Sequence, residues 1–174
     1  MTLTAIQQKF IVHWGEMGTR WGINRTVAQV HALLFLSPRP LNAEEIATTL
    51  GVARSNVSTS LRELQGWRIV RVTHIMGDRR DHFESMKDVW EMFRIILDER
   101  KKREGDPTLA MLREIVTDAK KSTSAPDAYA RERVSDMLQF FETMTGWYEQ
   151  TRKLPTPALV RMIRMGDKIA KVLG

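Results

Sequence analysis

Residues 51–64 read GVARSNVSTSLREL, and this stretch decides the fold. Val57, Leu61 and Leu64 recur four and three residues apart, which places them on one face of a helix. That apolar face packs inward, so the remaining side chains of the helix point outward. The outward set is Arg54, Ser55, Asn56, Ser58, Thr59 and Arg62. The stretch therefore predicts a helix with one apolar face and one polar face that carries two arginines.

The residues before this helix complete a helix-turn-helix pattern. A short helix is predicted from Asn42, an N-cap residue, with Glu44 and Glu45 in its first turn. Ala47 lets the two helices approach, and Gly51, four residues later, permits the sharp turn between them. The outward face of the second helix has the donors and acceptors that read base edges and phosphates in a DNA major groove. An ordinary helical hairpin with a polar surface has the same spacing and stays open as an alternative.

A β-hairpin is predicted directly after this pair of helices. The run RIVRVTHI at residues 68–75 alternates and is β-branched, and MGDRR and DHFES follow at residues 76–85. The expected tip is residues 77–80, which would set His74 opposite His82 across the hairpin. A two-stranded ribbon after a helix-turn-helix is a winged helix, and Arg79 and Arg80 at its tip can enter a minor groove. Two histidines supply only half of a zinc site, so we expect no metal.

Charge is concentrated in the same region. The chain of 174 residues has a net charge of +6 and a pI near 9.9. Residues 51–80 hold six arginines, at positions 54, 62, 68, 71, 79 and 80, against only Glu63 and Asp78. The planar guanidinium suits phosphates and guanine edges, so this balance favours double-stranded DNA as the partner. A solvated basic face is the plainer interpretation of the charge alone.

Several classes of function find no support in the sequence. The chain has no cysteine, Gly-rich phosphate loop, HExxH or GxSxG, so we expect neither an enzyme nor a cofactor. His13 and His31 lie within helical apolar stripes, where packing is the usual role of a lone histidine. No signal peptide and no apolar run of about 20 residues is visible, which favours a soluble, cytoplasmic protein with no membrane partner.

The flanking regions are expected to be helical. Apolar residues spaced three and four apart predict helices at about residues 3–21 and 24–36, and a third from residue 89. The third helix is expected to end at the charged segment DERKKREGDP, residues 98–107, which contains glycine and proline. Further helices are expected at about 108–121, 127–152 and 157–173. The expected domains are an N-terminal dimerisation helix at 1–22, a winged helix-turn-helix at 23–86, and a helical dimerisation and effector region at 87–174. Burial against a second subunit explains the many apolar stripes, and packing within one chain is the alternative.

The residues then resemble a known family. NRTVAQVHALLFLSPRPLNAEEIATTLGVARSNVSTSLRELQGWRIVRVTHIMGDRRDHFE, at 24–84, is similar to the DNA-binding core of MarR-type winged-helix repressors. FIVHWGEMGTRWGINRT at 10–26 and DVWEMFRIILDERKKRE at 88–104 resemble the GbsR-like branch. The resemblance implies a homodimeric, ligand-responsive repressor on a pseudo-palindromic operator. It also implies that Asp78 orients Arg80 toward the minor groove. The family often has serine at the recognition-helix N-cap, whereas Ala53 stands here, so the cap is weaker or moves to Ser55.

Two questions stay open from the sequence. Trp14, Trp21 and Trp90 could form an aromatic cage for a quaternary ammonium effector, which suits the GbsR-like resemblance, or they could be core residues. A winged helix can also serve as a protein–protein interaction adaptor that binds no specific DNA. The arginine density of residues 51–80 argues against that alternative. The sequence therefore favours a mainly α-helical DNA-binding transcriptional regulator with a small β-hairpin wing.

Overall fold

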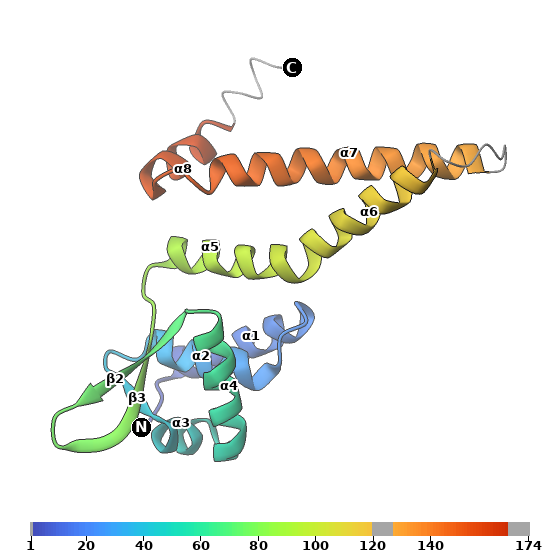
Figure 1. The fold of residues 1–174 in the computed structure, drawn as a ribbon. Coiled ribbons are helices and arrows are strands. Elements are labelled where there is room, and N and C mark those ends of the chain that lie inside the picture. Colours follow the sequence, from blue (N-terminus) through green and yellow to red (C-terminus); the bar gives the residue numbers. More distant parts are fainter. Residues whose placement is uncertain (1, 120–126, 167–174) are drawn as a thin grey trace. The chain divides into compact units, whose positions relative to one another are not determined.

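The computed structural model describes residues 2–119 and 127–166 of the chain. It divides into two compact units, Met1–Ile95 and Ile96–Gly174. The described part is mainly helical with one small antiparallel sheet, which confirms the predicted fold class (Figure 1). None of the described helices is long and apolar enough to cross a membrane.

The first unit holds the helix-turn-helix and the hairpin. Its elements are α1 (Ala5–Arg20), α2 (Arg25–Leu36), β1 (Leu41–Asn42), α3 (Ala43–Leu50), α4 (Arg54–Gly66), β2 (Val70–Ile75), β3 (Asp78–Ser85) and the beginning of α5 (Val89–Arg100). The strands form a sheet in the order β1-β3-β2, with both pairs antiparallel. In Figure 1 the β2–β3 ribbon projects from the cluster formed by α2, α3 and α4.

Helices α1 and α2 pack closely because glycines lie between them. A Cβ atom on Gly18 would lie 2.6 Å from the Cβ of Ala28, and one on Gly15 would lie 2.8 Å from the Gln29 side chain. Phe10 stacks on Trp14 with ring centroids 5.4 Å apart, beside the buried ring of His31. Helix α1 is therefore part of the first unit's own core.

The core of this unit lies among α2, α3, α4 and the sheet. Its fully buried side chains come from every one of these elements or their ends; they are Val30, Leu33, Leu34, Leu41, Ile46, Val57, Leu64 and Ile69. Burial of each such side chain contributes about 1.5–3 kcal/mol relative to exposure. This core fixes the direction in which the outer faces of α3 and α4 point.

The turn between α3 and α4 forms as its residue types predict. The Asn42 side chain accepts from the backbone N–H groups of Glu44 and Glu45, and Glu45 accepts from the N–H of Asn42. Helix α3 ends at Gly51, whose φ of 66° is the left-handed conformation that glycine adopts without a steric penalty. The chain then re-enters a helix at Arg54.

The wing differs from its predicted register. Residues Met76 and Gly77 make the turn, and Asp78 to Arg80 begin strand β3, so the predicted tip at residues 77–80 is wrong. His82 pairs with Thr73 rather than with His74, because the turn lies at Met76 and Gly77 and a β-bulge shifts the register between Thr73 and Ile75. Hairpin symmetry about Asp78 did not account for this bulge. His74 is consequently exposed, whereas His82 is buried.

The second unit consists of the end of α5, a π-helical turn at Lys101–Gly105, α6 (Asp106–Ala119), α7 (Asp127–Thr151) and α8 (Thr156–Arg164). The predicted charged stop at residues 98–107 is wrong, because the chain stays helical there. The backbone N–H of Asp106 donates to the carbonyl of Lys101, five residues earlier, as is typical of a π-helix. Pro107 follows in the first turn of α6. The ends of the helices predicted at 108–121 and 157–173 lie partly outside the described residues.

Helix α7 packs on α6 and on the end of α5. The Tyr148 hydroxyl donates to Asp98 at 2.6 Å, and Arg152 donates to the same carboxylate at 2.9 Å. Desolvation and this hydrogen bond raise the pKa of Tyr148 well above its usual range. A groove of about 440 Å³ lies beside the π-helical turn and is lined by Leu97, Phe141 and Met144 among others.

Candidate nucleic-acid interface

Helix α4 presents the predicted polar face to solvent. Val57, Leu61 and Leu64 are buried, with exposed fractions of 2% or less, and they anchor the opposite face. The exposed side chains are Arg54, Ser55, Asn56, Ser58, Thr59 and Arg62. Ser60 is buried and donates to the backbone carbonyl of Asn56 at 2.8 Å. The structure thus brings all six predicted residues of α4 to one surface.

The beginning of α4 departs from the usual N-cap. Ala53 is the N-cap residue and its side chain makes no hydrogen bond, so the cap does not move to Ser55. The two guanidinium groups of the face have weak local partners. Arg54 lies 3.9 Å from the Glu44 carboxylate, and Arg62 donates to the Thr59 hydroxyl at 3.4 Å. Both arginines are exposed, so these contacts leave them able to reach an external anion.

Asp78 holds Arg80 on the wing. The Arg80 guanidinium donates to both carboxylate oxygens, at 2.9 Å from Nε and 2.5 Å from Nη2. The backbone N–H of Arg80 also donates to this carboxylate at 3.0 Å. These bonds lower the pKa of Asp78 and raise that of Arg80, so the pair stays ionised. Asp78 is therefore a brace that fixes the direction of Arg80, which remains exposed.

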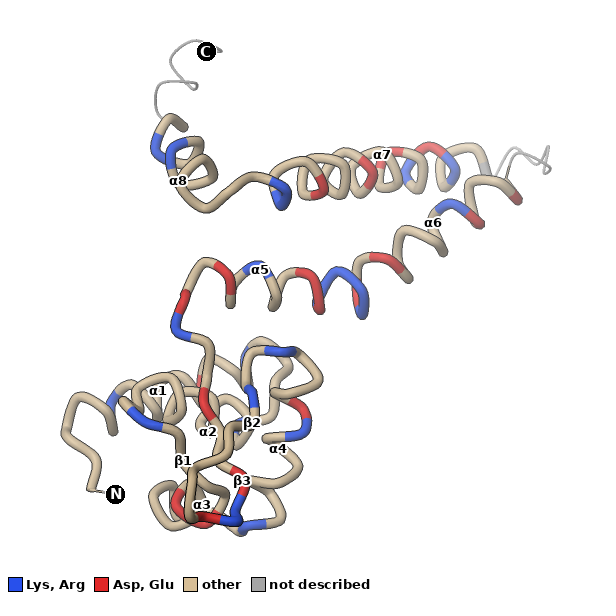
Figure 2. Tube along the Cα trace, turned by 60° about the vertical axis from the view of Figure 1, so that its left-hand side comes forward, with Lys and Arg blue, Asp and Glu red and all other residues tan. Residues whose placement is uncertain are grey.

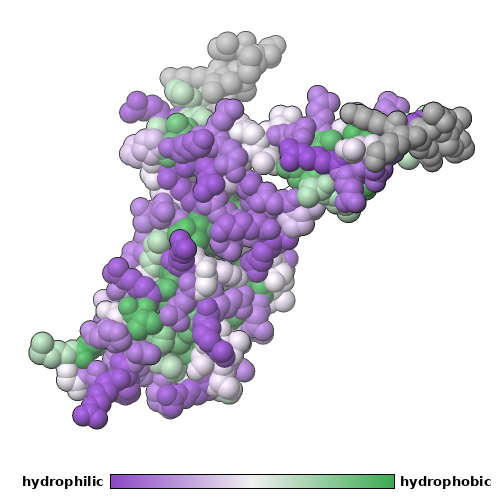
Figure 3. Space-filling view, in the orientation of Figure 1, coloured by the Kyte–Doolittle hydropathy of each residue, from purple (hydrophilic) through white to green (hydrophobic). Residues whose placement is uncertain are grey.

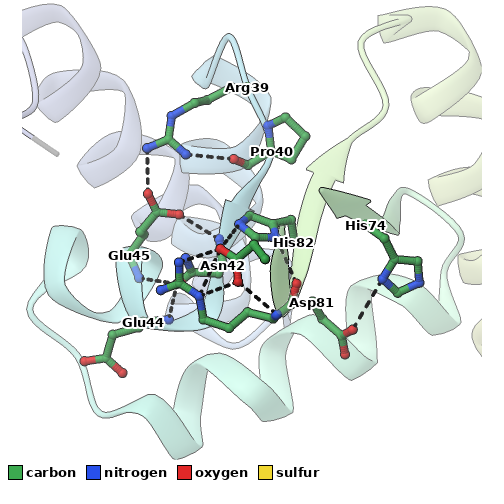
Figure 4. Close-up of polar contacts among 10 residues, drawn as sticks. Arg39, Pro40, Asn42, Glu44, Glu45, His74, Asp81 and His82 are labelled. Atoms are coloured by element: carbon green, nitrogen blue, oxygen red, sulfur yellow. Dashed lines mark hydrogen bonds and ion pairs between the residues drawn. The ribbon is translucent and has the colours of Figure 1, made fainter. Parts of the chain in front are cut away.

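A second layer of polar contacts supports this brace from behind (Figure 4). The buried His82 ring donates through Nδ1 to the carbonyl of Arg80 at 2.9 Å, and its Nε2 lies 3.5 Å from Asp78. The Glu45 carboxylate accepts a hydrogen bond from the Arg39 guanidinium at 2.6 Å, and this bond lowers the pKa of Glu45. The same carboxylate accepts from the backbone N–H of Asn42. The strand pairing of Asn42 with His82 ties the base of the wing to the beginning of α3.

A groove of about 380 Å³ runs between α4 and the sheet. Arg54 and Arg62 line it from α4, and Arg80 lines it from the wing. Val72 and Phe83 supply part of its apolar floor. Figure 2 shows basic positions on α4 and on the two strands of the wing. The groove thus brings arginines from two separate elements to one surface.

The two predicted wing arginines differ in their surroundings. Arg79 is exposed, and its side chain has no ion pair or hydrogen bond within the described part of the chain. Arg80, its neighbour, is held by Asp78. Alternation along a strand sends successive side chains to opposite faces, so the two arginines point in different directions. The Arg79 side chain can therefore change its rotamer to reach an anion, whereas the direction of the Arg80 guanidinium is fixed by Asp78.

The structure gives the histidines roles that the sequence did not predict. His74 lies 3.8 Å from Asp81, and both are exposed (Figure 4). His82 supports the Asp78–Arg80 pair instead of facing His74. Spacing i, i+2, i+4 along β3 was the available signal, since it places Asp78, Arg80 and His82 on one face. In residues 2–119 and 127–166, no group of three or more His, Cys, Asp or Glu side chains could hold a metal ion.

The three tryptophans are only partly brought together. Trp14 and Trp21 meet edge to face with ring centroids 6.4 Å apart, and 51% of Trp21 is exposed. Trp90 lies on α5, and none of the ring contacts between described residues joins it to the other two. The Lys87 ammonium lies 5.8 Å from the Phe35 ring centroid, so a cation already occupies the far end of this aromatic cluster.

Helix α4, the turn before it and the hairpin after it make Met1–Ile95 a winged helix-turn-helix unit. This class of protein places one helix in a DNA major groove and a wing alongside. Residues 21–81 match the family model of the MarR family. The match lies within this winged helix-turn-helix unit, so this region of the chain is similar to the MarR family.

Individual relatives agree with this assignment. Over 94 residues the chain is 26% identical to a putative HTH-type transcriptional regulator, YvaV, of Bacillus subtilis strain 168. The aligned region is 52% of this chain and 53% of that protein, so the chain spans about half the length of the curated relative that it matches. A crystal structure of a transcriptional regulator is 19% identical and has a TM-score of 0.55, with 91% of this chain and 98% of that chain covered, which shows a shared fold. A Staphylococcus aureus MepR mutant bound to an oligodeoxyribonucleotide is 15% identical over 77% of this chain and 91% of its own, with a TM-score of 0.39.

Proposed function

We propose that the protein is a sequence-specific DNA-binding repressor of the GbsR-like branch, acting as a homodimer on a pseudo-palindromic operator. One observation carries the proposal: Arg54, Ser58 and Arg62 of the exposed face of α4 line the same groove as the braced Arg80 of the wing. A helix in the major groove with a wing in the adjacent minor groove uses both surfaces at once. The MarR family match over residues 21–81 supports the same function.

The two surfaces have different tasks in this proposal. Asn56 and Arg62 reach base edges, because amide and guanidinium groups form paired hydrogen bonds with adenine and guanine. Arg54, Ser55, Ser58 and Thr59 surround them and position the helix on phosphates and flanking bases. Arg79 contacts phosphates, and Arg80, aimed by Asp78, enters the minor groove.

Selection of bound duplexes from a random DNA pool at moderate salt tests this proposal. Recovery of one sequence with two-fold symmetry supports a specific dimeric regulator. Asn56→Ala should then lose about 1–3 kcal/mol on the selected site and relax the preference at one base pair. Arg79→Ala should weaken selected and random DNA alike and reduce the salt slope by about one unit.

Arg164→Ala is the matched control, because it removes the same charge from an exposed position on α8. It should leave both specificity and salt slope unchanged. If no sequence is enriched and neither Asn56→Ala nor Arg79→Ala alters DNA binding, the DNA-binding assignment is wrong. The interaction-adaptor alternative then takes its place.

Exposed apolar surface on α7 supports the homodimer. Along this helix one stripe packs toward α6, and a second stripe remains exposed by 46–58%; it consists of Met137, Phe140, Met144 and Trp147. Large apolar side chains at three- and four-residue steps are typical of a helical interface. We propose that this stripe, with residues 1–22, joins two chains across a two-fold axis.

Ligand control belongs to the same proposal. Trp14 and Trp21 provide two ring faces at the exposed end of the aromatic cluster, where a quaternary ammonium group is held in this proposal; Trp90, which has no ring contact with them, is not part of this cage. An effector must bind the DNA-competent and incompetent forms unequally to act as a switch. Choline titrated against tryptophan fluorescence and operator release tests this. Unchanged fluorescence and operator affinity with choline-like amines would leave the protein a constitutive repressor.

A further inference from the structure

The tip of the wing carries the most exposed large hydrophobic side chain among the described residues. Met76 has an exposed fraction of 102%, and Ile75 before it is 42% exposed. Figure 3 shows hydrophobic atoms projecting from the end of the β2–β3 hairpin beyond hydrophilic neighbours. An apolar side chain exposed at the end of a hairpin is available to insert into a partner that the wing reaches.

Local backbone geometry holds Met76 away from the domain. Gly77, with φ of 84°, closes the turn directly after it. The pairing steps from Thr73↔His82 to Ile75↔Asp78, so several residues of β3 face a single residue of β2 at this bulge. A bulge twists the ribbon and re-aims the residues beyond it. The brace between Asp78 and Arg80 anchors the strand immediately beyond the turn, so the tip is presented on a fixed support.

Charged side chains flank the tip. Arg79 and Arg80 follow the turn at once; Asp78 pairs with Arg80, and Glu84 pairs with Arg71 of β2 at 2.6 Å, whereas Arg79 makes no ion pair among the described residues. An apolar point flanked by arginines matches a duplex, which has a polyanionic rim and an apolar stack of bases inside it. A protein or membrane partner would require an apolar patch larger than one or two side chains.

We propose that Met76 is a wedge that inserts between two base pairs in the minor groove, unstacks that step and bends the operator. The inference rests on the proposed DNA-binding function and adds a deformation to it. Pyrimidine–purine steps unstack most easily, so such a step should occur where the wing tip meets each half-site. Met76 then contributes specificity through DNA shape, without a hydrogen bond to any base.

Two substitutions separate the wedge from ordinary wing contacts. Met76→Leu keeps an apolar side chain of similar size, whereas Met76→Ser removes it, and neither affects the core because the position is fully exposed. The probe is the duplex recovered by selection, with end-label energy transfer to report bending and 2-aminopurine at the candidate step to report unstacking. Wild type and Met76→Leu should bend the duplex and raise the 2-aminopurine signal.

Met76→Ser should abolish both signals and weaken the selected site by about tenfold, with little effect on random DNA. Its salt slope should equal that of wild type, because no phosphate contact is lost, in contrast to Arg79→Ala. A wild-type complex with unbent DNA, or a Met76→Ser complex bent as in wild type, overturns the wedge while DNA binding stands. Failure of wild type to bind any duplex overturns the proposed function and the wedge together.

Discussion

Single side chains in this protein show how burial and partners determine protonation. The His31 ring is 4% exposed, lies between Trp14 and Phe35, and its Nε2 atom has no hydrogen-bond partner among the described residues. Desolvation, with a further contribution from the Lys87 charge, lowers the pKa of His31 to about 4. Helical spacing predicted the buried position of His31, but the nearby Lys87 comes from a segment more than fifty residues away.

The free energy of unfolding should fall as the pH is lowered from about 6.5 to about 4. His31 stays neutral when folded across this window, whereas the unfolded chain takes up a proton, so acid favours unfolding. The loss amounts to about 3 kcal/mol by pH 4. His31→Leu should remove this dependence, measured by urea unfolding at several pH values. The same substitution at the exposed His13 is the control, and an unaltered pH profile in His31→Leu would contradict the expectation.

Asp78 should raise the affinity for DNA although its own charge is negative, because it orients Arg80. Asp78→Ala frees Arg80 and should weaken operator binding about as much as Arg80→Ala does. Asp81→Ala removes an equal charge from an exposed position three residues along the same strand. It should strengthen binding slightly, because a repulsive charge is lost. Affinities of the three variants on the selected duplex check this, and a gain in Asp78→Ala would show that it does not orient Arg80.

The brace also shows what a sequence can disclose at this scale. The family resemblance implied the ion pair between Asp78 and Arg80, because these residues match the family's Asp-x-Arg spacing. The support behind it depends on strand register: the position of the turn and the bulge between Thr73 and Ile75 together set that register, and the partner of His82 was misassigned because the turn was placed at 77–80. The sequence placed Glu45 in the first turn of its helix but gave no sign of its ion pair with Arg39.

Helices were predicted best where a capping residue stands next to apolar residues with helical spacing. Helices α3 and α4 follow from Asn42, Gly51 and the Val57, Leu61, Leu64 stripe, which are local signals. The predicted stop after α5 failed because charge, glycine and proline are also compatible with a π-helical turn that continues the helix. Local composition could not distinguish the two outcomes, since the hydrogen-bonding step depends on how α6 packs against α7.

The contact between α1 and α2 makes a prediction about glycine. Gly18→Ala should destabilise the first unit by about 1–3 kcal/mol, because its Cβ would lie 2.6 Å from that of Ala28. Gly146 on α7 has open space around it, so Gly146→Ala should stabilise its helix by about 0.5–1 kcal/mol. Chemical denaturation followed by circular dichroism compares them. Equal and favourable effects of both alanines would show that α1 and α2 are not in close contact at this point.

At the scale of the whole molecule, apolar stripes predicted burial but not what covers them. Periodic apolar residues predicted a helix at 127–152, and within a single chain its stripe of Val134, Phe141 and Tyr148 is only half buried against its own unit. A neighbouring stripe, exposed at Phe140 and Trp147, was not distinguished from it, because sequence periodicity cannot separate a face that meets α6 from one that faces outward.

Sedimentation at micromolar concentration should show twice the chain mass of 20.1 kDa. Phe140→Asp places a charge in the exposed stripe of α7 and should yield monomers that retain their helical circular dichroism. Gln139→Asp, at the adjacent exposed polar position, should stay dimeric. A wild-type monomer would exclude the two-fold operator, and a dimeric Phe140→Asp would place the interface elsewhere.

The π-helical turn at Lys101–Gly105 has an evolutionary consequence. A wide turn of this kind accommodates one residue more than a regular helix, as a single-codon insertion would supply. Deletion of one residue within it would restore α-helical bonding and rotate all that follows by about 100°. Leu109 and Leu112, which are now buried, would turn away from their present neighbours. Chains of this lineage should therefore keep the length of this segment even where its residues vary, because a change of one residue alters the face that α6 presents.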